Sequence, residues 1–386
     1  MNLPKLASLC LVASIFSAPA LALETERPRP PEEQAAPIAY LYDVTSGQVL
    51  FAREADRRFM PASLTKVMTT FLAFEWMDER RISQGQTFSI RPALWREWSG
   101  VGSTMFLPHD ARISIDQLVH GVTTVSANDG AAVLAESAAG SVAEWVAAMN
   151  AKAEEIGMKD SRFGTPNGWM DEGRTFTTAR DLALLATQMV RGHPSKYRHF
   201  VGQREFTFNG ITQPNHDPIT GQVPGADGIK TGFTNQAGYG FLGSAQRDGR
   251  RLVVVVAGSE RARERNGAAR DLIEWGFSDF DQEELFAPNA QVASASVQGG
   301  SRLSVGLQAP HGIYLTRPTG QQGDVELTVS YDGPLKAPIR KGEALATLTI
   351  KADGVPTYSV PLVAVEEIEE AGFLRRFVNG FAGWFR

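Results

Sequence analysis

A serine and a lysine stand three residues apart, at Ser63 and Lys66, where an apolar helical pattern begins. Residues three apart on a helix share a face, so the Lys66 amine can reach the Ser63 hydroxyl. A serine hydroxyl is a weak nucleophile that needs an adjacent base, and a lysine serves as that base only when its amine is neutral. The pair has the residue types and spacing for nucleophilic catalysis by Ser63 with Lys66 as the general base, but a spacing this short is also common by chance.

The place of Lys66 conflicts with the usual preferences of a helix start. The first turn carries unpaired N–H groups and a partial positive charge, which favour an acid over a cation. A serine followed three residues later by glutamate would form a capping box, and here lysine occupies the position of that acid. The plain alternative is a serine cap with a lysine directed into solvent. Two further motifs favour the catalytic interpretation.

The other two motifs are 126-SAN-128, in a predicted turn between helices, and 230-KTG-232, on a predicted strand. Motifs of this kind accompany Ser-x-x-Lys in class A β-lactamases and penicillin-binding proteins. Their order and their local settings indicate one active site. Lys230 would then be a second cation near Lys66, and together with burial and the helix start it would lower the pKa of Lys66.

The chain resembles the low-molecular-weight penicillin-binding proteins that act as serine-type D-alanyl-D-alanine carboxypeptidases. The resemblance extends beyond the three motifs and covers nearly all of the chain after the first 22 residues. Besides the motifs it includes the stretches 47-GQVLF-51, 163-FGTPNGW-169, 178-TARDLALLA-186, 226-ADGIKTGFTNQAGYGFLGSA-245 and 274-EWGF-277.

The resemblance implies removal of the terminal D-alanine from peptidoglycan stem pentapeptides through an acyl-enzyme on Ser63, which β-lactams would also acylate. Lys66 would take the proton of Ser63, and Ser126 would relay a proton to the leaving amine. The oxyanion would be bound by the backbone N–H groups of Ser63 and Phe233. The implied substrate-binding residues are Asn128, Lys230, Thr231, Gly232, Phe233 and Arg265, of which Lys230, Thr231 and Arg265 would hold the terminal carboxylate. No metal or other cofactor is implied.

Two positions depart from related patterns. Phe233 stands where some relatives carry histidine, so we expect a different substrate preference or pH dependence. Ala127 stands where class A β-lactamases carry aspartate. A class A-like β-lactamase is the nearest alternative, but it needs a loop glutamate for deacylation, and Glu172 is the only candidate in the stretch 163–173. A DD-endopeptidase remains a further alternative, and a non-catalytic wall-binding module is disfavoured by the intact set of motifs.

The elements expected to carry the three motifs fall in a simple order along the sequence: strands come first and last in the domain, and helices lie between them. The patterns predict strands at 38–43, 48–54, 227–234, 238–246 and 251–259, with helices dominating 64–192 and another at 264–277. The two strand groups should meet in one antiparallel sheet with helices packed on it, an α+β fold of the β-lactamase and transpeptidase type. We place this domain at 37–280 and a small all-β sandwich at 281–365.

The two chain ends predict export and membrane attachment. Residues 1–22 form a predicted signal peptide ending in Ala-Leu-Ala, followed by a Pro- and charge-rich linker at 23–36. A lipid anchor on Cys10, the only cysteine, is disfavoured by the leucine before it. Residues 366–386 predict an amphipathic helix on the inner-membrane surface, the alternative being a helix docked on the protein itself. We therefore expect a periplasmic protein peripherally attached to the inner membrane.

Composition excludes other classes of partner. The chain has 386 residues, a net charge of −5 and no basic block, so nothing indicates a nucleic-acid partner. None of the six histidines has a familiar metal-binding spacing, and we expect all of them to be structural or surface residues.

Overall fold

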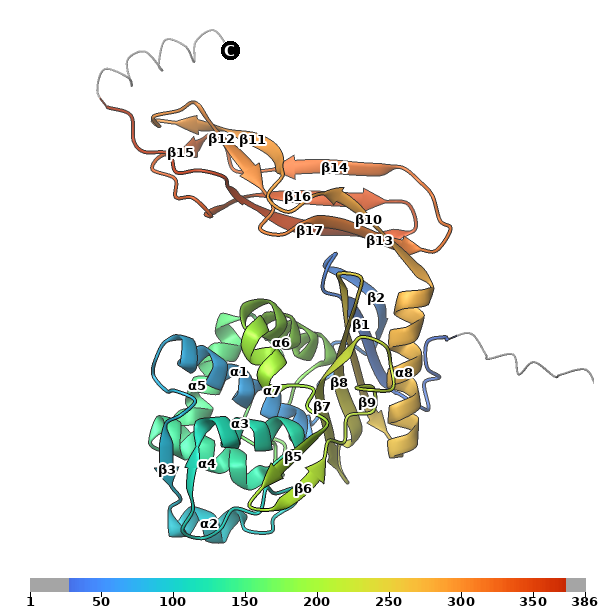
Figure 1. Ribbon diagram of the computed structural model, residues 1–386. Coiled ribbons are helices and arrows are strands. Elements are labelled where there is room, and N and C mark those ends of the chain that lie inside the picture. Colours follow the sequence, from blue (N-terminus) through green and yellow to red (C-terminus); the bar gives the residue numbers. More distant parts are fainter. Residues whose placement is uncertain (1–27, 373–386) are drawn as a thin grey trace, which may run out of the picture.

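The protein has a larger α+β domain and a C-terminal β domain, joined at one end of helix α8 (Figure 1). The computed structural model describes residues 28–372. The predicted signal peptide at 1–22 and most of the predicted C-terminal helix lie outside the described residues. Helix α8 (Ala262–Ser278) ends just before β10 (Phe280–Phe286), next to the predicted boundary between the domains.

One five-stranded sheet organises the α+β domain, in the order β2-β1-β9-β8-β7. Strands β1 (Ile38–Asp43) and β2 (Gln48–Arg53) precede the helices, whereas β7 (Ala226–Thr234), β8 (Gly238–Arg247) and β9 (Arg250–Ser259) follow them. β1 pairs antiparallel with β9, so the two strand groups meet in one sheet as predicted.

Helices cover both faces of this sheet. Side chains of β9 alternate between two cores: Val253 and Val255 face the larger helical side, while Leu252 and Val254 face α8. Burial on both faces explains the continuous apolar run of this central strand. The helices of the larger side are α1 (Thr65–Asp78), α2 (Pro92–Trp98), α3 (Ile115–Thr124), α4 (Asn128–Ala139), α5 (Val142–Glu155), α6 (Ala179–Gly192) and α7 (Pro194–Phe200).

Helix α1 lies at the centre of the larger core. Its sequence suggested an apolar stripe, but every residue from Thr65 to Phe74 is buried, including the polar Lys66 and Thr69. A helix surrounded on all sides needs partners for its buried polar side chains. Lys66, Thr69 and Thr70 have them, whereas the Thr65 hydroxyl has none among the described residues. Two short two-stranded ribbons lie outside the main sheet. In one, β3 (Thr87–Ser89) pairs with β4 (Arg112–Ser114) on either side of α2; in the other, β5 (Glu205–Phe208) pairs with β6 (Ile211–Pro214) after α7.

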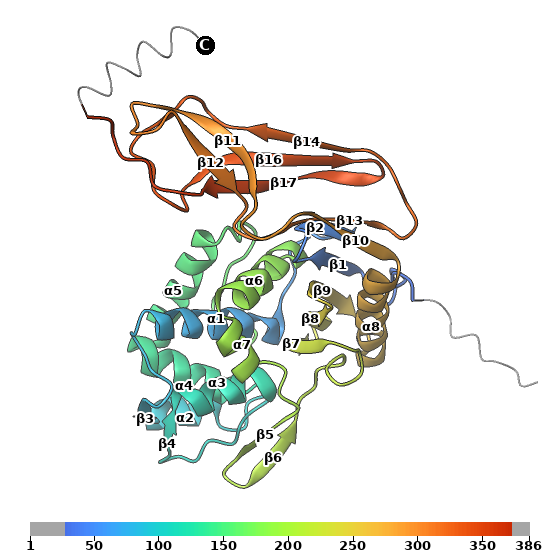
Figure 2. The same cartoon turned by 45° about the horizontal axis from the view of Figure 1, so that its top comes forward.

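The C-terminal domain is all β, as predicted (Figure 2). One sheet has the order β14-β16-β17-β12-β11-β15, and β10 pairs with β13 in a separate ribbon that runs next to β1 and β2. The remaining strands are β11 (Gln291–Gln298), β12 (Ser304–Gln308), β13 (Ile313–Pro318), β14 (Val325–Ser330), β15 (Leu335–Lys336), β16 (Ala344–Ala352) and β17 (Val355–Ala364).

The predicted helix at 366–386 does not begin at 366. Residues 366–372 contain no helix, and Ile368 is bridged to Ile339 and buried in the core of the β domain. Hydrophobic pairing of this segment with the sheet therefore prevails over the helical pattern. The rest of that prediction lies outside the described residues. Within residues 28–372, no helix has the length and apolar character needed to cross a bilayer.

A buried polar cluster joins the two domains. Asp43, at the end of β1, is fully buried and accepts hydrogen bonds from Arg250 Nε at 2.8 Å and from Thr316 Oγ1 of the β domain at 2.9 Å. The side-chain amide of Gln48 also donates to the Thr316 carbonyl oxygen and accepts from its backbone N–H. This cluster fixes the ribbon of the β domain to the edge of the five-stranded sheet.

Candidate active site

Ser63 and Lys66 lie in contact at the start of α1. Ser63 is the middle residue of a short 3-10 turn, Ala62–Leu64, and Lys66 is the second residue of the helix that follows. Lys66 Nζ is 2.9 Å from Ser63 Oγ. The helix has no side-chain N-cap and no acid in its first turn, so Ser63 does not cap it. The lysine points inward rather than into solvent.

The surroundings of Lys66 suit a neutral amine. Its side chain is 1% exposed, and its Nζ lies 2.7 Å from Asn128 Oδ1 and 2.8 Å from the carbonyl oxygen of Asn167. These two oxygens accept the two N–H bonds of a neutral amine, which leaves its lone pair free to accept the proton of the Ser63 hydroxyl. Burial and then the nearby Lys230 hold the pKa of Lys66 well below its ordinary value.

Ser126, in the second motif, offers an unused hydroxyl. The residue is 4% exposed and has a φ of +61°, a backbone conformation uncommon for serine. Its Oγ has no hydrogen-bond partner among the described residues. A buried hydroxyl without a partner is costly, and strained backbone of this kind gathers at functional sites. The arrangement suits a group whose partner is supplied by a substrate.

The third motif lies on β7, the edge strand that passes beside the 3-10 turn of Ser63. Gly232 makes this approach possible, because a Cβ there would stand 2.7 Å from the Pro61 carbonyl oxygen. Lys230 is 5% exposed, and burial followed by Arg265 lowers its pKa to about 7. Its Nζ donates to the carbonyl oxygen of Thr231 at 3.0 Å. The strand thus holds a buried amine close enough to Lys66 to lower the pKa of that lysine.

Arg265, on α8, lies against β8, the strand next to β7. Its Nη1 donates to the carbonyl oxygen of Gly240 at 2.8 Å and its Nε to the side chain of Asn266 at 2.7 Å. Burial lowers the pKa of Arg265 to about 10, and its charge in turn lowers the pKa of Lys230. Arg265 and Lys230 therefore form one electropositive region, which favours an anion.

A cavity of about 370 Å³ opens above Ser63. Phe233 stands half-exposed on its rim and stacks on Tyr239 with ring centroids 4.1 Å apart. The lining contains no acidic residue: it consists of Ser63, Gly102, Ser103, Asn128, Asn167, Gly168, Trp169, Met170, Phe233, Thr234 and Asn235. Glu172 is exposed and lies outside this lining. Among the described residues, no carboxylate lines this cavity to serve as the deacylation base that a class A enzyme needs.

Sequence patterns did not reveal several residues that complete the site. The carbonyl oxygen of Asn167 accepts a hydrogen bond from Lys66. In the sequence, the stretch 163–169 is distinguished only by the family resemblance, which assigns no role to Asn167. Gly168 lies against Ala62, where a Cβ would stand 1.8 Å from the Ala62 carbonyl oxygen. Buried Asp129 accepts from the backbone N–H of Met105 at 3.0 Å, which fixes the segment beside the second motif. The only sequence feature that could have indicated these contacts is the position of the acid Asp129, directly after the second motif.

The spacing of the histidines in the sequence also did not indicate a cluster of side chains of the kinds that bind metals. Asp116 and His120, four apart on α3, lie with His199 of α7 so that their donor atoms fall within 4.8 Å of one another. The Asp116 carboxylate and His199 Nε2 are 3.0 Å apart and form a hydrogen bond. That pairing accounts for the cluster, which shares no residue with the cavity at Ser63.

The fold and the site together define a serine enzyme of the penicillin-binding class. Residues 24–261 match the family described as D-alanyl-D-alanine carboxypeptidase, and residues 280–370 match that described as penicillin-binding protein 5, C-terminal domain. The chain therefore belongs to the D-alanyl-D-alanine carboxypeptidase family, as its sequence motifs predicted, and it is a serine hydrolase.

Curated relatives and solved structures share this architecture. D-alanyl-D-alanine carboxypeptidase DacA of Haemophilus influenzae is 32% identical over 345 residues, which cover 89% of this chain and 87% of the relative. DacF of Bacillus subtilis is 30% identical over 355 residues, 90% of each chain. The crystal structure of penicillin binding protein 5 from H. influenzae superposes with a TM-score of 0.76 at 31% identity, covering 88% of this chain and 99% of that one.

Proposed function

We propose that this protein removes the terminal D-alanine from peptidoglycan stem pentapeptides through an acyl-enzyme on Ser63. The observation that carries the proposal is the buried Lys66 amine, which contacts the Ser63 hydroxyl while two neutral oxygens occupy its N–H bonds. Such an amine can act as a base at neutral pH, which an ordinary lysine cannot.

Acylation begins when Lys66 Nζ takes the Ser63 proton and Ser63 Oγ forms a bond to the carbonyl carbon of the penultimate D-alanine. Backbone N–H groups of Ser63 and Phe233 stabilise the resulting oxyanion. The carbon–nitrogen bond then breaks as the proton held by Lys66 passes through Ser126 to the leaving amine, which makes Lys66 neutral again. The Ser126 hydroxyl is available for this relay because it has no partner among the described residues. D-alanine departs, and Ser63 is left as an ester.

Deacylation uses water and returns the enzyme to its starting state. Water adds to the ester carbon as its proton passes to the Lys66 amine, and Ser63 leaves with a proton. The products are the shortened peptide with a new carboxylate and the free serine. Before these steps, the terminal carboxylate of the substrate is held by Lys230 and Thr231, with Arg265 reinforcing the positive field. Asn128 binds the amide side of the substrate and keeps Lys66 in position.

β-Lactams are proposed to acylate the same serine. The structure of penicillin-binding protein D2 from Listeria monocytogenes in its cefotaxime-bound form is similar to 65% of this chain, with a TM-score of 0.59 and 29% identity. The cavity lining at Ser63 offers no carboxylate to hydrolyse a penicilloyl ester quickly. A stoichiometric burst with nitrocefin therefore supports the peptidase, and fast steady hydrolysis supports a β-lactamase.

Mass spectrometry tests the whole proposal. The protein is incubated with a diacyl-Lys-D-Ala-D-Ala peptide and, separately, with penicillin. The expected results are loss of one D-alanine from the peptide and a penicilloyl adduct on the tryptic peptide that carries Ser63. The matched control is Ser63→Ala, which should show neither. An adduct on another residue, or an intact peptide after long incubation, overturns the proposal.

We also propose that the protein works in the periplasm, attached to the inner membrane by its C-terminus. The support is the signal-like segment at 1–22 and the aromatic and basic residues after 372. Removing residues 373–386, which leaves the buried Ile368 in place, should release the protein from liposomes of anionic lipid without loss of penicillin labelling. A truncated protein that still sediments with the liposomes contradicts the membrane role.

A further inference from the structure

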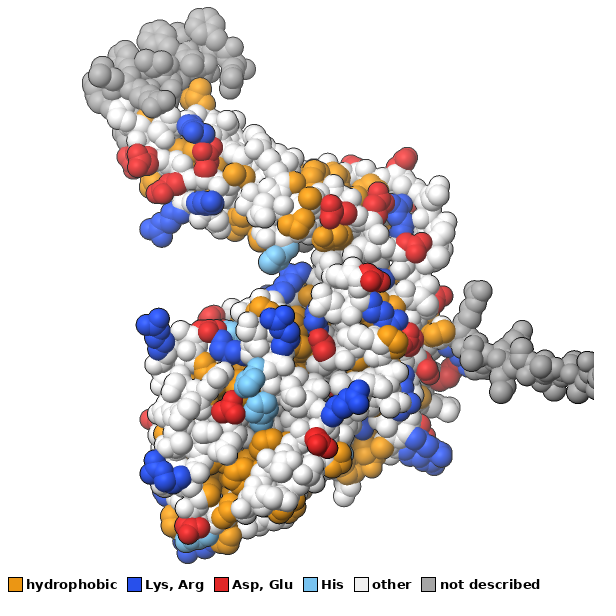
Figure 3. Space-filling view, in the orientation of Figure 1, with side chains coloured by type: hydrophobic (Ala, Val, Ile, Leu, Met, Phe, Trp, Pro, Cys, Tyr) orange, Lys and Arg blue, Asp and Glu red, His pale blue; other side chains and the backbone are white. Residues whose placement is uncertain are grey.

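A second cavity, of about 630 Å³, lies between the two domains and away from Ser63. The space-filling view shows this hollow, with basic side chains and a histidine facing it (Figure 3). One wall comes from the turn after β1, from α6 and α7, and from Gln246 and Arg251 of β8 and β9. The other wall comes from the segments 288–289 and 310–314 of the β domain. No residue that lines it also lines the cavity at Ser63.

The lining is basic and contains no acidic side chain. Arg191, Arg198 and Arg251 face the cleft from the larger domain, and His311 faces it from the β domain. Asp227 neutralises Arg251 through two hydrogen bonds of 3.0 and 2.8 Å. The charge that remains available in the cleft therefore belongs to the other two arginines.

Arg191 and Arg198 lack a carboxylate partner within residues 28–372. The hydrogen bond that Arg191 donates goes to a neutral acceptor, the carbonyl oxygen of Val44. The acid that acts on Arg191 is Asp43, which is already held by Arg250 at 2.8 Å. In a protein of net charge −5, two uncompensated guanidinium groups beside one cleft are a local excess of positive charge.

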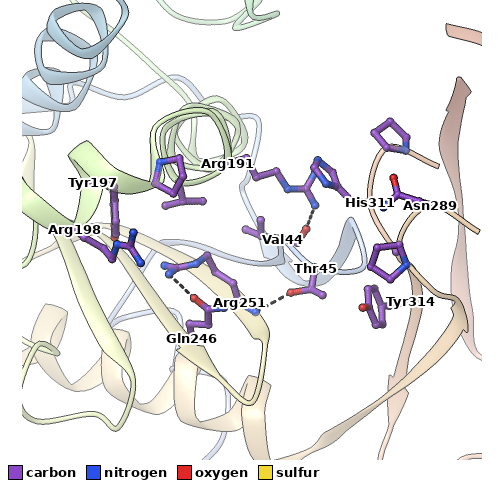
Figure 4. A pocket seen from close by; sticks show the side chains of 15 residues that line it. Val44, Thr45, Arg191, Tyr197, Arg198, Gln246, Arg251, Asn289, His311 and Tyr314 are labelled. Atoms are coloured by element: carbon purple, nitrogen blue, oxygen red, sulfur yellow. Dashed lines mark hydrogen bonds between the residues drawn. The ribbon is translucent and has the colours of Figure 1, made fainter. Parts of the chain in front are cut away.

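The two domains present their cationic groups to each other. Arg191 reaches across the cleft toward His311 (Figure 4). Burial and then the charge of Arg191 lower the pKa of His311. Arg191 and His311 repel each other when both are charged, so an anion between them would stabilise the charged forms of both. Guanidinium groups suit carboxylate and phosphate oxygens because their planar N–H bonds can pair with two oxygens at once.

We propose that this interdomain cleft binds a ligand with two or more carboxylate or phosphate groups, held by Arg191, Arg198 and His311. The volume admits a ligand of several such groups rather than a single small ion. Since the contacts come from both domains, the bound ligand bridges the domains. It would strengthen their association beyond what the polar cluster around Asp43 provides. The site is separate from Ser63, so its occupation does not depend on the acyl-transfer chemistry.

Calorimetric titration of the full chain at low ionic strength tests the cleft with two probes, pyrophosphate and tricarballylate. The Arg198→Gln and His311→Gln variants should each bind the preferred probe about tenfold more weakly or worse, because each loses a charge-assisted contact. Arg112→Gln, an exposed arginine on β4, is the matched control and should bind as the parent does. Penicillin labelling of Ser63 should be unchanged in all three variants.

The two probes separate the two sources of negative charge. Tighter binding of tricarballylate assigns the cleft to a polycarboxylate, and tighter binding of pyrophosphate assigns it to a phosphate compound. The proposal is overturned if neither probe binds at millimolar concentration, or if the cleft variants bind as well as Arg112→Gln.

Discussion

Asn128 and Lys66 are joined by a hydrogen bond of 2.7 Å in which the side-chain oxygen of Asn128 accepts from the lysine amine. The amide cannot turn round, because its Nδ2 donates to the Val101 carbonyl oxygen at 2.9 Å. Asn128 therefore gives Lys66 an acceptor without a negative charge. A carboxylate of the same shape would favour the ammonium form, in which the amine cannot take the proton of Ser63.

The Asn128→Asp variant should acylate slowly at neutral pH. The new carboxylate raises the pKa of Lys66, whose base form exists above that pKa and is lost as the pH falls through it. We expect the acid limb of the rate of penicillin acylation to move up by about one to two pH units, which is roughly a 10- to 100-fold loss at neutral pH. Fluorescent-penicillin labelling rates across pH measure this shift.

Asn235→Asp is the matched control for that experiment, since Asn235 lines the same cavity and has no described contact with Lys66. Its pH profile should stay close to that of the parent. Equal profiles for the parent and Asn128→Asp would mean that the protonation of Lys66 does not limit acylation.

The Lys66→Arg variant should be nearly inert toward penicillin. An arginine keeps the positive charge at every accessible pH and has no lone pair to accept the Ser63 proton. We expect the acylation rate to fall by about a hundredfold or more. Lys351→Arg, on an exposed strand of the β domain, provides a control for the substitution itself. Normal acylation by Lys66→Arg would remove Lys66 from the role of base.

The sequence predicted those parts of the site that depend on side-chain type. Ser63, Lys66 and Lys230 stand out because serine and lysine are needed for the chemistry at fixed spacings from helix and strand starts. The sheet topology was also predictable, because β1 and β9 have apolar strand patterns at opposite ends of one domain. Both inferences rest on local pattern and residue identity.

Contacts made by the backbone and across domains were not predictable in this way. The carbonyl oxygen of Asn167 holds Lys66, and any residue could supply a carbonyl oxygen there. Asp43 and Thr316 meet only because the β domain folds back onto β1, and no local pattern reports that distance in space. The start of the expected helix at 366 was wrong because tertiary pairing of Ile368 with Ile339 outweighs helical periodicity.

The Gly232→Ala variant should lose both stability and activity. The added Cβ would stand 2.7 Å from the Pro61 carbonyl oxygen and 3.0 Å from Leu64 Cγ, so β7 must move away from the turn that carries Ser63. We expect a loss of about 1–3 kcal/mol in the free energy of unfolding and a drop in acylation rate of about tenfold or more. Urea titration and penicillin labelling measure the two effects.

Gly267→Ala is a matched control for that variant, because a Cβ at this position of α8 meets no atom within 4 Å. It should leave acylation unchanged and stabilise the helix by about 0.5–1 kcal/mol. If Gly232→Ala resembles Gly267→Ala in both measurements, close approach of β7 to the turn is not required.

Binding of the substrate carboxylate should weaken as the pH rises through the pKa of Lys230, which burial and Arg265 lower to about 7. The protonated form that attracts the carboxylate is complete below this value and lost above it. In Lys230→Arg the cation does not titrate, so KM for a D-Ala-D-Ala peptide should rise less between about pH 6 and about pH 9. Parallel KM profiles for parent and variant would exclude Lys230 as the titrating anchor.

The Asp43→Ala variant should destabilise the whole chain strongly. Removing this fully buried carboxylate leaves Arg250 buried without its ion-pair partner and takes the acceptor from Thr316 across the domain boundary. We expect a loss of about 3–5 kcal/mol in the free energy of unfolding. Asp56→Ala removes an ion pair with Arg180 whose carboxylate is 67% exposed, and it should cost only about 0–1 kcal/mol. Urea titrations that give equal losses for the two variants would show that the buried cluster does not hold the domains together.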